Sequence, residues 1–392
     1  MQSICPGSMR PLLGISLLDP LNLRVDTVKT TLTDALSDNW RAQLRHAIRA
    51  PAALHQALAL TPQEREGVSY AERVGMPLLI PPYYLSLCNP DDPNCPIRKQ
   101  CVPTGDESVC IRGDRVDPLG EAAHEVAPRL IRRYPDRVLL LVTLNCAVHC
   151  RFCTRSRLVR NNSGFVSSQK LDPALRWLAD HPEVREVLVS GGDPLVASTQ
   201  RLDRLLSHLR SIQHLEIIRI GTRVPVVLPM RINSELVEML ASHNPLWVMT
   251  HFNHPKELTS RAQTALRMLS DAGLPVMNQT VMLRGINNDP GVLETLFRGL
   301  VRHRVRPYYL LHADVMEGTG HLRTALSQSI EIFAALQGRL SGIALPKLVV
   351  DTPGGAGKVP VGPETIVSQS PGRTVLRTFR GEEVEILDPD QA

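Results

Sequence analysis

The sequence predicts an α/β protein whose main part is a partial, open parallel barrel of the TIM type, with a helical region before it and a short extension after it. Two observations support this fold class. From about residue 138, apolar runs of strand length alternate with amphipathic segments of helix length, as is typical of parallel sheets. Polar residues also gather at the end of each apolar run, which is where such sheets form their sites.

The elements of the barrel can be placed by residue number. Helices are expected near 169–180, 200–212, 233–242, 257–272, 290–302 and 322–337. We therefore divide the chain into a mainly helical region at 1–135, the barrel at 136–360 and a C-terminal extension at 361–392. Strands are expected at Val138–Val142, Val184–Val189, Leu215–Ile220, Leu246–Met249, Pro275–Leu283, Val305–Leu311 and Leu345–Val350.

The N-terminal region contains two helix signals. Ala35 to Leu60 is amphipathic, with apolar residues at roughly helical spacing, so a helix is expected there. A new helix is expected to begin after Thr61. Thr61 suits the N-cap, Pro62 suits the first helical position, and Glu64 completes a capping box.

Composition and charge exclude several classes of partner. Of the 392 residues, 43% are hydrophobic, as in a soluble globular protein with a sizeable core. The net charge of +5 is spread along the chain and only 4% of residues are aromatic, so we expect no nucleic-acid binding. No apolar stretch has the length of a membrane span. We expect a cytoplasmic protein that does not bind membranes.

Three cysteines carry the most specific chemical signal. Cys146, Cys150 and Cys153 follow the first barrel strand with the spacing C-x3-C-x2-C. Three thiolates are one fewer than a closed site needs, so a [4Fe–4S] cluster held here would keep one iron open to a small molecule. Phe152 would shield such a cluster from water. A zinc site with a remote fourth ligand and three unrelated thiols are the alternatives.

Four further cysteines lie in and around a turn-rich loop. The spacing of Cys88, Cys95, Cys101 and Cys110 fits no zinc motif, and disulfides are not expected in a reducing compartment. We interpret them as ordinary thiols, with a second metal site as the alternative.

Several ordered motifs together resemble the lysine 2,3-aminomutase family of radical S-adenosylmethionine (SAM) enzymes. The similarity runs from about Pro81 to near Ser370, and it implies a radical SAM partial barrel. The motifs, besides the cysteine loop, are Asn89-Pro-Asp-Asp-Pro-Asn-Cys-Pro-Ile-Arg-Lys-Gln100, Arg133-Tyr-Pro-Asp-Arg137, Ser190-Gly-Gly-Asp-Pro194, Arg219-Ile-Gly-Thr-Arg-Val-Pro225, His251-Phe-Asn-His-Pro-Lys-Glu-Leu258, Arg306-Pro-Tyr-Tyr309 and Asp351 to Lys358.

The resemblance implies two cofactors besides the cluster. SAM would bind the open iron, and the residues that the resemblance places near SAM are Ser190, Gly191, Gly192, Asp193, His251 and Gln279. For His251 and Gln279, ordinary strand-end hydrogen bonding is the alternative. The glycines would let the backbone approach SAM closely, and Asp193 would close their turn.

Pyridoxal 5′-phosphate (PLP) is the second implied cofactor. Lys358 ends a glycine-rich turn, and its amine would condense with the PLP aldehyde. A glycine-rich turn that ends in lysine also suggests a phosphate-binding loop, but this turn lacks the Walker spacing. A solvent-exposed loop lysine is the alternative. Arg133, Tyr134 and Arg137 match the family's phosphate clamp, whereas a basic helix end is the alternative.

The resemblance also implies a small basic amino acid as substrate. Arg155 matches the residue that pairs with the substrate carboxylate, and Asp314 and Asp351 match two acids that receive a distal ammonium. L-Lysine is the favoured substrate, and glutamate is disfavoured. The alternatives are an L-arginine 2,3-aminomutase, or an enzyme that forms β-lysine for elongation factor P modification. The two acids would otherwise merely cap strand ends.

Other classes of function remain open at this point. The chain is also compatible with a SAM-cleaving enzyme of another reaction type, or with a non-catalytic metal-binding or electron-transfer protein. As an aminomutase, it is an isomerase that needs an electron donor such as flavodoxin or ferredoxin. We expect a homo-oligomer, and no C-terminal zinc, because no cysteine follows Cys153.

Overall fold

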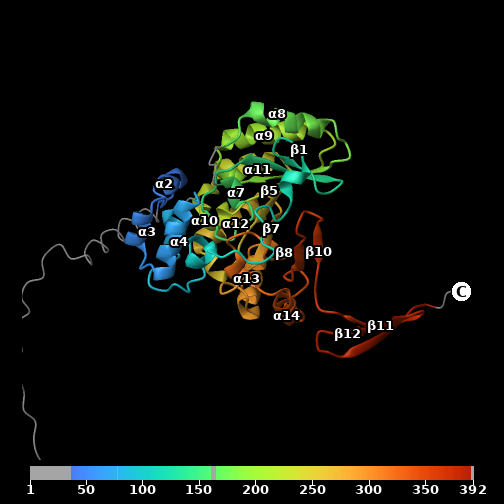
Figure 1. Ribbon diagram of the computed structural model, residues 1–392. Coiled ribbons are helices and arrows are strands. Elements are labelled where there is room, and N and C mark those ends of the chain that lie inside the picture. Colours follow the sequence, from blue (N-terminus) through green and yellow to red (C-terminus); the bar gives the residue numbers. More distant parts are fainter. Residues whose placement is uncertain (1–36, 77, 160–164, 390–392) are drawn as a thin grey trace, which may run out of the picture.

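The computed structural model describes residues 37–76, 78–159 and 165–389. Its main feature is a sheet with the strand order β1-β2-β3-β4-β5-β6-β7-β8-β9-β10. Each pairing from β3 to β9 is parallel, whereas β1, β2 and β10 are antiparallel additions at the two ends. In the described part of the chain the two ends of the sheet do not pair. The predicted open barrel is therefore confirmed (Figure 1).

The parallel strands lie close to where the sequence predicts them. The apolar runs are continuous because parallel strands in this position are covered on both faces. Two short strands before residue 136 also join the sheet. The bounds are β1 Glu125–Ala127, β2 Leu130–Ile131, β3 Arg137–Thr143, β4 Glu186–Gly191, β5 Ile217–Gly221, β6 Leu246–Thr250, β7 Val276–Met282, β8 Val305–His312, β9 Lys347–Asp351 and β10 Lys358–Pro360.

Helices cover the outer side of the sheet (Figure 1). Each presents one apolar face to it; the buried residues of α9, for example, are Leu202, Leu205, Leu206 and Leu209. The six predicted barrel helices are confirmed, with ends shifted by a few residues. They are α8 Ser168–Ala179, α9 Thr199–Ser211, α11 Ser234–Ser242, α12 Ser260–Asp271, α13 Pro290–Arg302 and α14 Leu326–Leu336, and the short α7 Ser156–Val159 and α10 Val224–Val227 lie in loops.

The predicted helix from Ala35 to Leu60 is wrong as a single element. Ala35 and Leu36 lie outside the described residues, and the remainder forms α2 Trp40–Arg45 and α3 Pro51–Ala57. The chain is extended at Ile48, which exchanges backbone hydrogen bonds with Ile80. Pro51 has no N–H to continue an earlier helix, so it begins the second one instead.

The other N-terminal helix signal is confirmed. In α4 Pro62–Arg73, the Thr61 hydroxyl accepts the Glu64 N–H and the Glu64 carboxylate accepts the Thr61 N–H. Glu64 also forms a buried bidentate ion pair with Arg98. This pair connects α4 to the short helix α6 Arg98–Cys101, and a further short helix of the region is α5 Pro82–Leu85.

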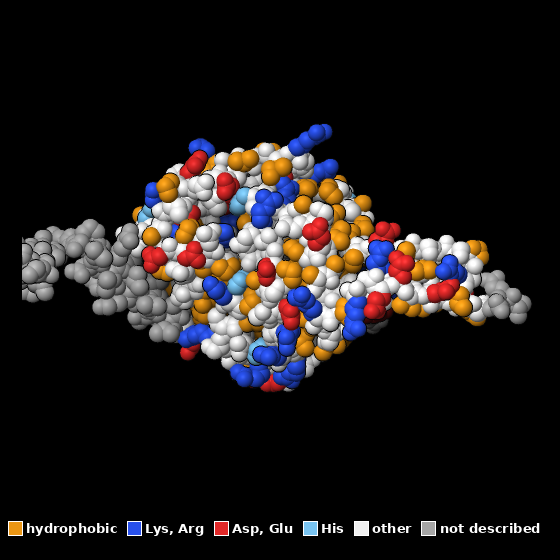
Figure 2. Space-filling model, turned by 90° about the horizontal axis from the view of Figure 1, so that it is seen from below, with side chains coloured by type: hydrophobic (Ala, Val, Ile, Leu, Met, Phe, Trp, Pro, Cys, Tyr) orange, Lys and Arg blue, Asp and Glu red, His pale blue; other side chains and the backbone are white. Residues whose placement is uncertain are grey.

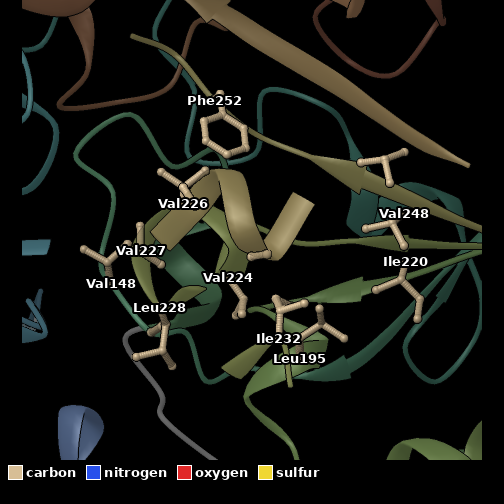
Figure 3. Packing of buried hydrophobic residues seen from close by; sticks show 14 of the residues in the cluster. Val148, Leu195, Ile220, Val224, Val226, Val227, Leu228, Ile232, Val248 and Phe252 are labelled. Atoms are coloured by element: carbon tan, nitrogen blue, oxygen red, sulfur yellow. The ribbon is translucent and has the colours of Figure 1, made fainter. Parts of the chain in front are cut away.

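The core lies between the outer face of the sheet and the helices. Alternate side chains of β4 point to opposite faces of the sheet. Val187 and Val189 join the core, whereas Leu188 and Ser190 line a cavity on the inner side. Figure 3 shows the core around α10, where Val224, Val226 and Phe252 pack together. This packing fixes the loops that follow β5 and β6.

The C-terminal strands form a separate, small sheet. Strands β11 Ile366–Ser370, β12 Arg373–Arg377 and β13 Glu383–Leu387 pair antiparallel and project from the barrel (Figure 1). Figure 2 shows this projection beside a face on which charges of both signs are mixed. Within the described ranges, no helix combines the length and apolar character that crossing a membrane requires.

Candidate active site

One cavity collects all of the predicted site residues. It has a volume of about 460 Å³, which is in the range of small-molecule sites. It lies on the inner side of the sheet, where the carboxyl ends of the parallel strands meet. Its lining includes Arg133, Tyr134, Arg137, Cys146, Cys150, Cys153, Arg155, Ser190, Gly191, Gly192, Asp193, His251, Gln279, Asp314, Asp351 and Lys358.

The cysteine loop follows β3 and is anchored by a buried arginine. Arg151 is 1% exposed, and its guanidinium forms a bidentate ion pair with Glu107, with Nε 2.7 Å from Oε1. The Arg151 N–H also donates to the carbonyl of Gln100 at 2.9 Å. The loop between the second and third cysteines is thereby attached to the N-terminal region.

The three thiols of this loop suit a metal cluster. Burial raises the pKa of Cys146 well above its usual value, raises that of Cys150, and raises that of Cys153 to about 11. Bound iron replaces the thiol protons, so a cluster removes the cost of three neighbouring buried thiolates. This donor set fits a [4Fe–4S] cluster with one iron that has no protein ligand.

The glycine pair after β4 packs directly against the cysteine loop. A Cβ on Gly191 would lie 2.1 Å from the carbonyl oxygen of Thr143, and a Cβ on Gly192 would lie 2.1 Å from that of Asn145. The Gly192 N–H donates to Thr143 at 2.6 Å. Glycine is thus needed at both positions because the two loops approach too closely to leave room for a Cβ.

Asp193 closes the turn, as expected, and also connects two strand ends. Its carboxylate accepts the Leu195 N–H at 3.1 Å, the Thr222 hydroxyl at 2.7 Å and the Arg223 N–H at 2.7 Å. Burial raises its pKa despite these hydrogen bonds. The loops after β4 and β5 are therefore held together by one carboxylate.

His251 directly follows β6, Gln279 lies on the neighbouring strand β7, and both border the cavity. Nε2 of His251 is buried and has no hydrogen-bond partner among the described residues. Burial, together with the charge of Arg223, lowers the pKa of His251 to about 3, so the ring is neutral. Its ring centroid is 5.5 Å from that of Phe152. An unsatisfied buried nitrogen beside the cysteine loop fits a bound polar ligand such as SAM.

The lysine turn joins β9 to β10 at the open end of the barrel. The antiparallel register puts Lys358 opposite Asp351, and the two side chains form an ion pair. Gly355 and Gly357 have φ values of +91° and +115°, which favour glycine. The Lys358 N–H donates to the Tyr134 hydroxyl at 2.9 Å. This hydrogen bond fixes the backbone of the turn, and the primary amine, which pairs with Asp351 and borders the cavity, suits an aldehyde cofactor such as PLP.

The predicted phosphate clamp lies beside this turn. Arg133 donates to Asp351 at 2.6 Å and to the carbonyl of Gly355 at 3.2 Å. The Arg137 guanidinium stacks 4.0 Å from the ring centroid of Tyr134. The three residues come together, but Arg133 is paired with an acid in this ligand-free state.

The two predicted substrate acids differ in their electrostatic state. Burial by itself would raise the pKa of Asp351, but Lys358 and Arg133 lower it below the usual value. Asp314 has no ion pair or side-chain hydrogen bond in the described chain. Burial, and then the neighbouring Asp351, raise its pKa to about 7. Asp314 is therefore the acid without a direct ion pair, although the charges of Lys358, Arg133 and Arg155 partly counteract this rise.

The predicted carboxylate-binding residue already has a partner. Arg155 donates from Nε to Glu121 at 2.8 Å, and Arg157 donates to the same carboxylate at 3.2 Å. Glu121 is 3% exposed. Glu121 thus pairs with the arginine that was assigned to the substrate carboxylate.

Arg223 is a site residue to which sequence reasoning assigned no role. Its Nη1 donates to the Cys150 sulfur at 2.8 Å, and its Nη2 lies 2.8 Å from Glu257 and 2.6 Å from the carbonyl oxygen of the Gln100 side chain. The motif Arg219-Ile-Gly-Thr-Arg-Val-Pro225 contained it. The motif alone did not indicate a role for Arg223, because the residues that contact its side chain lie far apart in the sequence.

Across the described residues, no three His, Cys, Asp or Glu side chains are placed to hold a single metal ion, and this includes the three cysteines of the cysteine loop as well as the four N-terminal ones. Cys88, Cys95 and Cys101 are buried, Cys110 is exposed, and all four are free thiols. The sulfurs of Cys88 and Cys101 are 3.8 Å apart.

Comparisons with known proteins agree with this geometry. The radical SAM superfamily profile matches residues 140–295 and the lysine-2,3-aminomutase profile matches residues 333–392. The L-lysine 2,3-aminomutase of Clostridium subterminale is 44% identical over 361 residues, which are 92% of this chain and 86% of that protein. The enzyme of the same name from Bacillus subtilis is 44% identical over 353 residues, 90% of this chain and 75% of that one.

A relative with a different named substrate is less similar. The glutamate 2,3-aminomutase of Clostridioides difficile is 36% identical over 379 residues, which are 96% of this chain and 89% of that protein. These similarities extend over nearly the whole chain and include the cysteine loop, the cavity and the lysine turn. The chain belongs to the lysine 2,3-aminomutase family of radical SAM enzymes.

Proposed function

We propose that this protein is an L-lysine 2,3-aminomutase, an isomerase that moves the α-amino group of L-lysine to the β-carbon. One observation carries the choice of substrate. Asp314, which has no direct ion pair and whose pKa is raised by burial, borders the same cavity as the three cysteines and Lys358. A buried carboxylate of this kind is stabilised by a cationic ligand, and the distal ammonium of lysine supplies one.

The cofactors supply the chemistry that amino acid side chains cannot. In the proposal, Cys146, Cys150 and Cys153 hold a [4Fe–4S] cluster at which SAM is cleaved to a radical, and PLP bound at Lys358 supplies a π-system across which nitrogen can migrate. Gly191 and Gly192 keep the cysteine loop close to β4. Arg133, Tyr134 and Arg137 would bind the phosphate of PLP as a group of two guanidiniums and a phenol.

The remaining roles concern SAM and the substrate. Ser190, Asp193, His251 and Gln279 would bind or orient SAM, with the neutral His251 ring offering Nε2 to the ligand. Arg155 would bind the α-carboxylate of lysine after it exchanges Glu121 for the substrate. Asp351 would assist Asp314 with the distal ammonium when Lys358 is engaged by PLP.

Partners and location complete the proposal. The cluster needs a one-electron donor such as flavodoxin or ferredoxin, and a reducing compartment such as the cytoplasm. A homo-oligomer is supported by the small C-terminal sheet, because Ile366, Val384, Ile386 and Leu387 are all exposed on it. Size-exclusion chromatography with light scattering measures the oligomeric state, and a monomer at micromolar concentration would remove this part.

A substrate panel tests the proposed reaction. The protein is reconstituted anaerobically with iron, sulfide and PLP, and is incubated with SAM, dithionite and one L-amino acid at a time. Mass spectrometry with an authentic standard identifies β-lysine. We expect conversion of lysine, with slower conversion of arginine and none of glutamate. Preferred conversion of glutamate or alanine would overturn the assignment of Asp314 and Asp351.

A further inference from the structure

The side chain of Arg223 is fixed by contacts from four segments of the chain. It is 8% exposed, and its Nη2 lies within 3.0 Å of the Tyr84 hydroxyl, the Gln100 side-chain oxygen and the Glu257 carboxylate. Its guanidinium carbon is 5.1 Å from the ring centroid of Phe152. Nη1 donates to the sulfur of Cys150 at 2.8 Å, whereas Nε is buried and has no hydrogen-bond partner among the described residues.

The backbone around Arg223 is equally constrained. Its N–H donates to Asp193, and α10 begins directly after it. The valines of α10 are buried among core residues such as Phe252 and Leu195 (Figure 3). Arg223 therefore presents a preorganised hydrogen bond and a positive charge to one cysteine sulfur.

Glu257 partly balances this positive charge. Its side chain is fully buried, and Oε2 accepts the Asn253 N–H at 2.6 Å and the His254 N–H at 3.1 Å, while Oε1 accepts from Arg223 and Tyr84. Without the Glu257 carboxylate, the positive charge of the buried Arg223 guanidinium would be uncompensated. The ion pair thus sets how much positive charge reaches the cysteine loop.

We infer that Arg223 tunes the reduction potential of the cluster, with Glu257 limiting the effect. This inference rests on the proposed cluster at the three cysteines. The reduced cluster carries one more negative charge than the oxidised one, so a hydrogen bond to its sulfur and a nearby cation stabilise the reduced form. Arg223 acts through Cys150, so it is a positioning residue that makes electron uptake easier before SAM is cleaved.

The test measures the potential rather than turnover. Wild type, Arg223→Met, Arg223→Lys and Glu257→Gln are reconstituted anaerobically, assayed for iron and sulfide, and titrated with dithionite in mediators while the reduced cluster is followed by electron paramagnetic resonance. Arg223→Met should disfavour reduction at least tenfold, which for one electron is a shift of 59 mV to lower potential. Arg223→Lys keeps the charge but not the planar fork, so a smaller shift in the same direction is expected.

Glu257→Gln provides the sign test. It removes the compensating negative charge and leaves Arg223, so the potential should rise. A merely structural role would move both variants in the same direction. Arg231→Met is the matched control, because Arg231 is also a buried arginine, at 1% exposed, but donates to the carbonyls of Leu195 and Ala197. Its potential should stay at the wild-type value.

The outcomes separate this inference from the proposed function. A wild-type protein that binds no iron at the cysteines would refute the proposed function itself. A full cluster with an unchanged potential in Arg223→Met would overturn the inference alone, as would equal shifts in Arg223→Met and Glu257→Gln. If Arg223→Met does not hold a cluster, Arg223→Lys and Glu257→Gln decide: opposite shifts support the inference and unchanged potentials overturn it.

Discussion

The cysteine loop and the lysine turn line the same cavity, but they are held in different ways. The cysteine loop is fixed chiefly by the Arg151–Glu107 pair, whose two residues take no part in the proposed ligand binding, and by the backbone bonds of Gly192. At the lysine turn, the groups assigned to ligands pair with one another. Lys358 and Arg133 both contact Asp351.

This difference indicates that the two sides respond differently to ligands. The cysteine side is preorganised, so a cluster and SAM would bind with little rearrangement. On the lysine side each proposed ligand would replace an internal ion pair, and Arg155 with Glu121 follows the same pattern. The internal pairs compensate the buried charges, and in the proposed function PLP and substrate would take over those contacts.

The largest effect is expected at Lys358. Lys358→Ala removes the amine that would hold PLP, so turnover should fall to background and the absorbance of enzyme-bound PLP should disappear. Lys347→Ala, at the exposed start of β9, is the matched control and should keep both. If Lys358→Ala still forms the covalent PLP absorbance band, another lysine holds the cofactor.

The next effect concerns the acid without a direct ion pair. Asp314→Asn should lower kcat/KM for lysine by about 10²- to 10⁴-fold, because breaking a buried ion pair costs about 3–5 kcal/mol. Steady-state kinetics with norleucine, which has the same carbon chain as lysine but no distal ammonium, provides the comparison. An equal loss with both substrates would mean that Asp314 does not recognise the distal charge.

The anchor of the cysteine loop should appear in stability rather than in substrate recognition. Arg151→Met leaves Glu107 buried without its partner and should lower the free energy of unfolding by about 3–5 kcal/mol. Denaturant unfolding of the apoprotein measures this change. Glu294→Ala, which breaks the exposed pair with Arg298, should cost less than about 0.5 kcal/mol. Similar costs for the two variants would contradict a preorganised cysteine side.

The smallest effect is a pH dependence from Asp314. Its pKa of about 7 means that the acid is increasingly protonated as the pH falls below 7. A cationic substrate favours the ionised form, so kcat/KM for lysine should fall up to about tenfold per pH unit below that value and level off above it. The pKa of Asp351 is lowered, so it remains charged in this range. Asp314→Asn should lack this step, and a step that persists in the variant belongs to another group.

Local patterns in the sequence predicted most of the barrel. Strands β3 to β9 and the helices α8, α9 and α11 to α14 follow from apolar periodicity, because each element buries apolar side chains against its neighbours. The helix over Ala35–Leu60 was predicted wrongly because the same periodicity continues past Arg45, where α2 ends, and through Pro51, which begins α3. Strands β1 and β2 were too short to give a pattern.

The site residues were predicted as a set, whereas their partners were not. Motif positions identified Cys150, Asp351 and Arg155, which come together in the cavity. Their contacts to Arg223, Arg133 and Glu121 depend on how distant segments pack, and no local pattern in the sequence reports that. The raised pKa of Asp314 is also a property of burial in the folded chain.

An isotope crossover experiment tests the central claim most directly. Lysine carrying ¹³C at every carbon and ¹⁵N in the α-amino group is mixed with an equal amount of unlabelled lysine, and the anaerobic reconstituted protein is supplied with SAM, PLP and dithionite. The account predicts β-lysine that is either fully labelled or unlabelled, with ¹⁵N bonded to C3, because nitrogen migrates within one bound molecule. Exchange of nitrogen between the two populations, or the absence of a β-amino product, would contradict it.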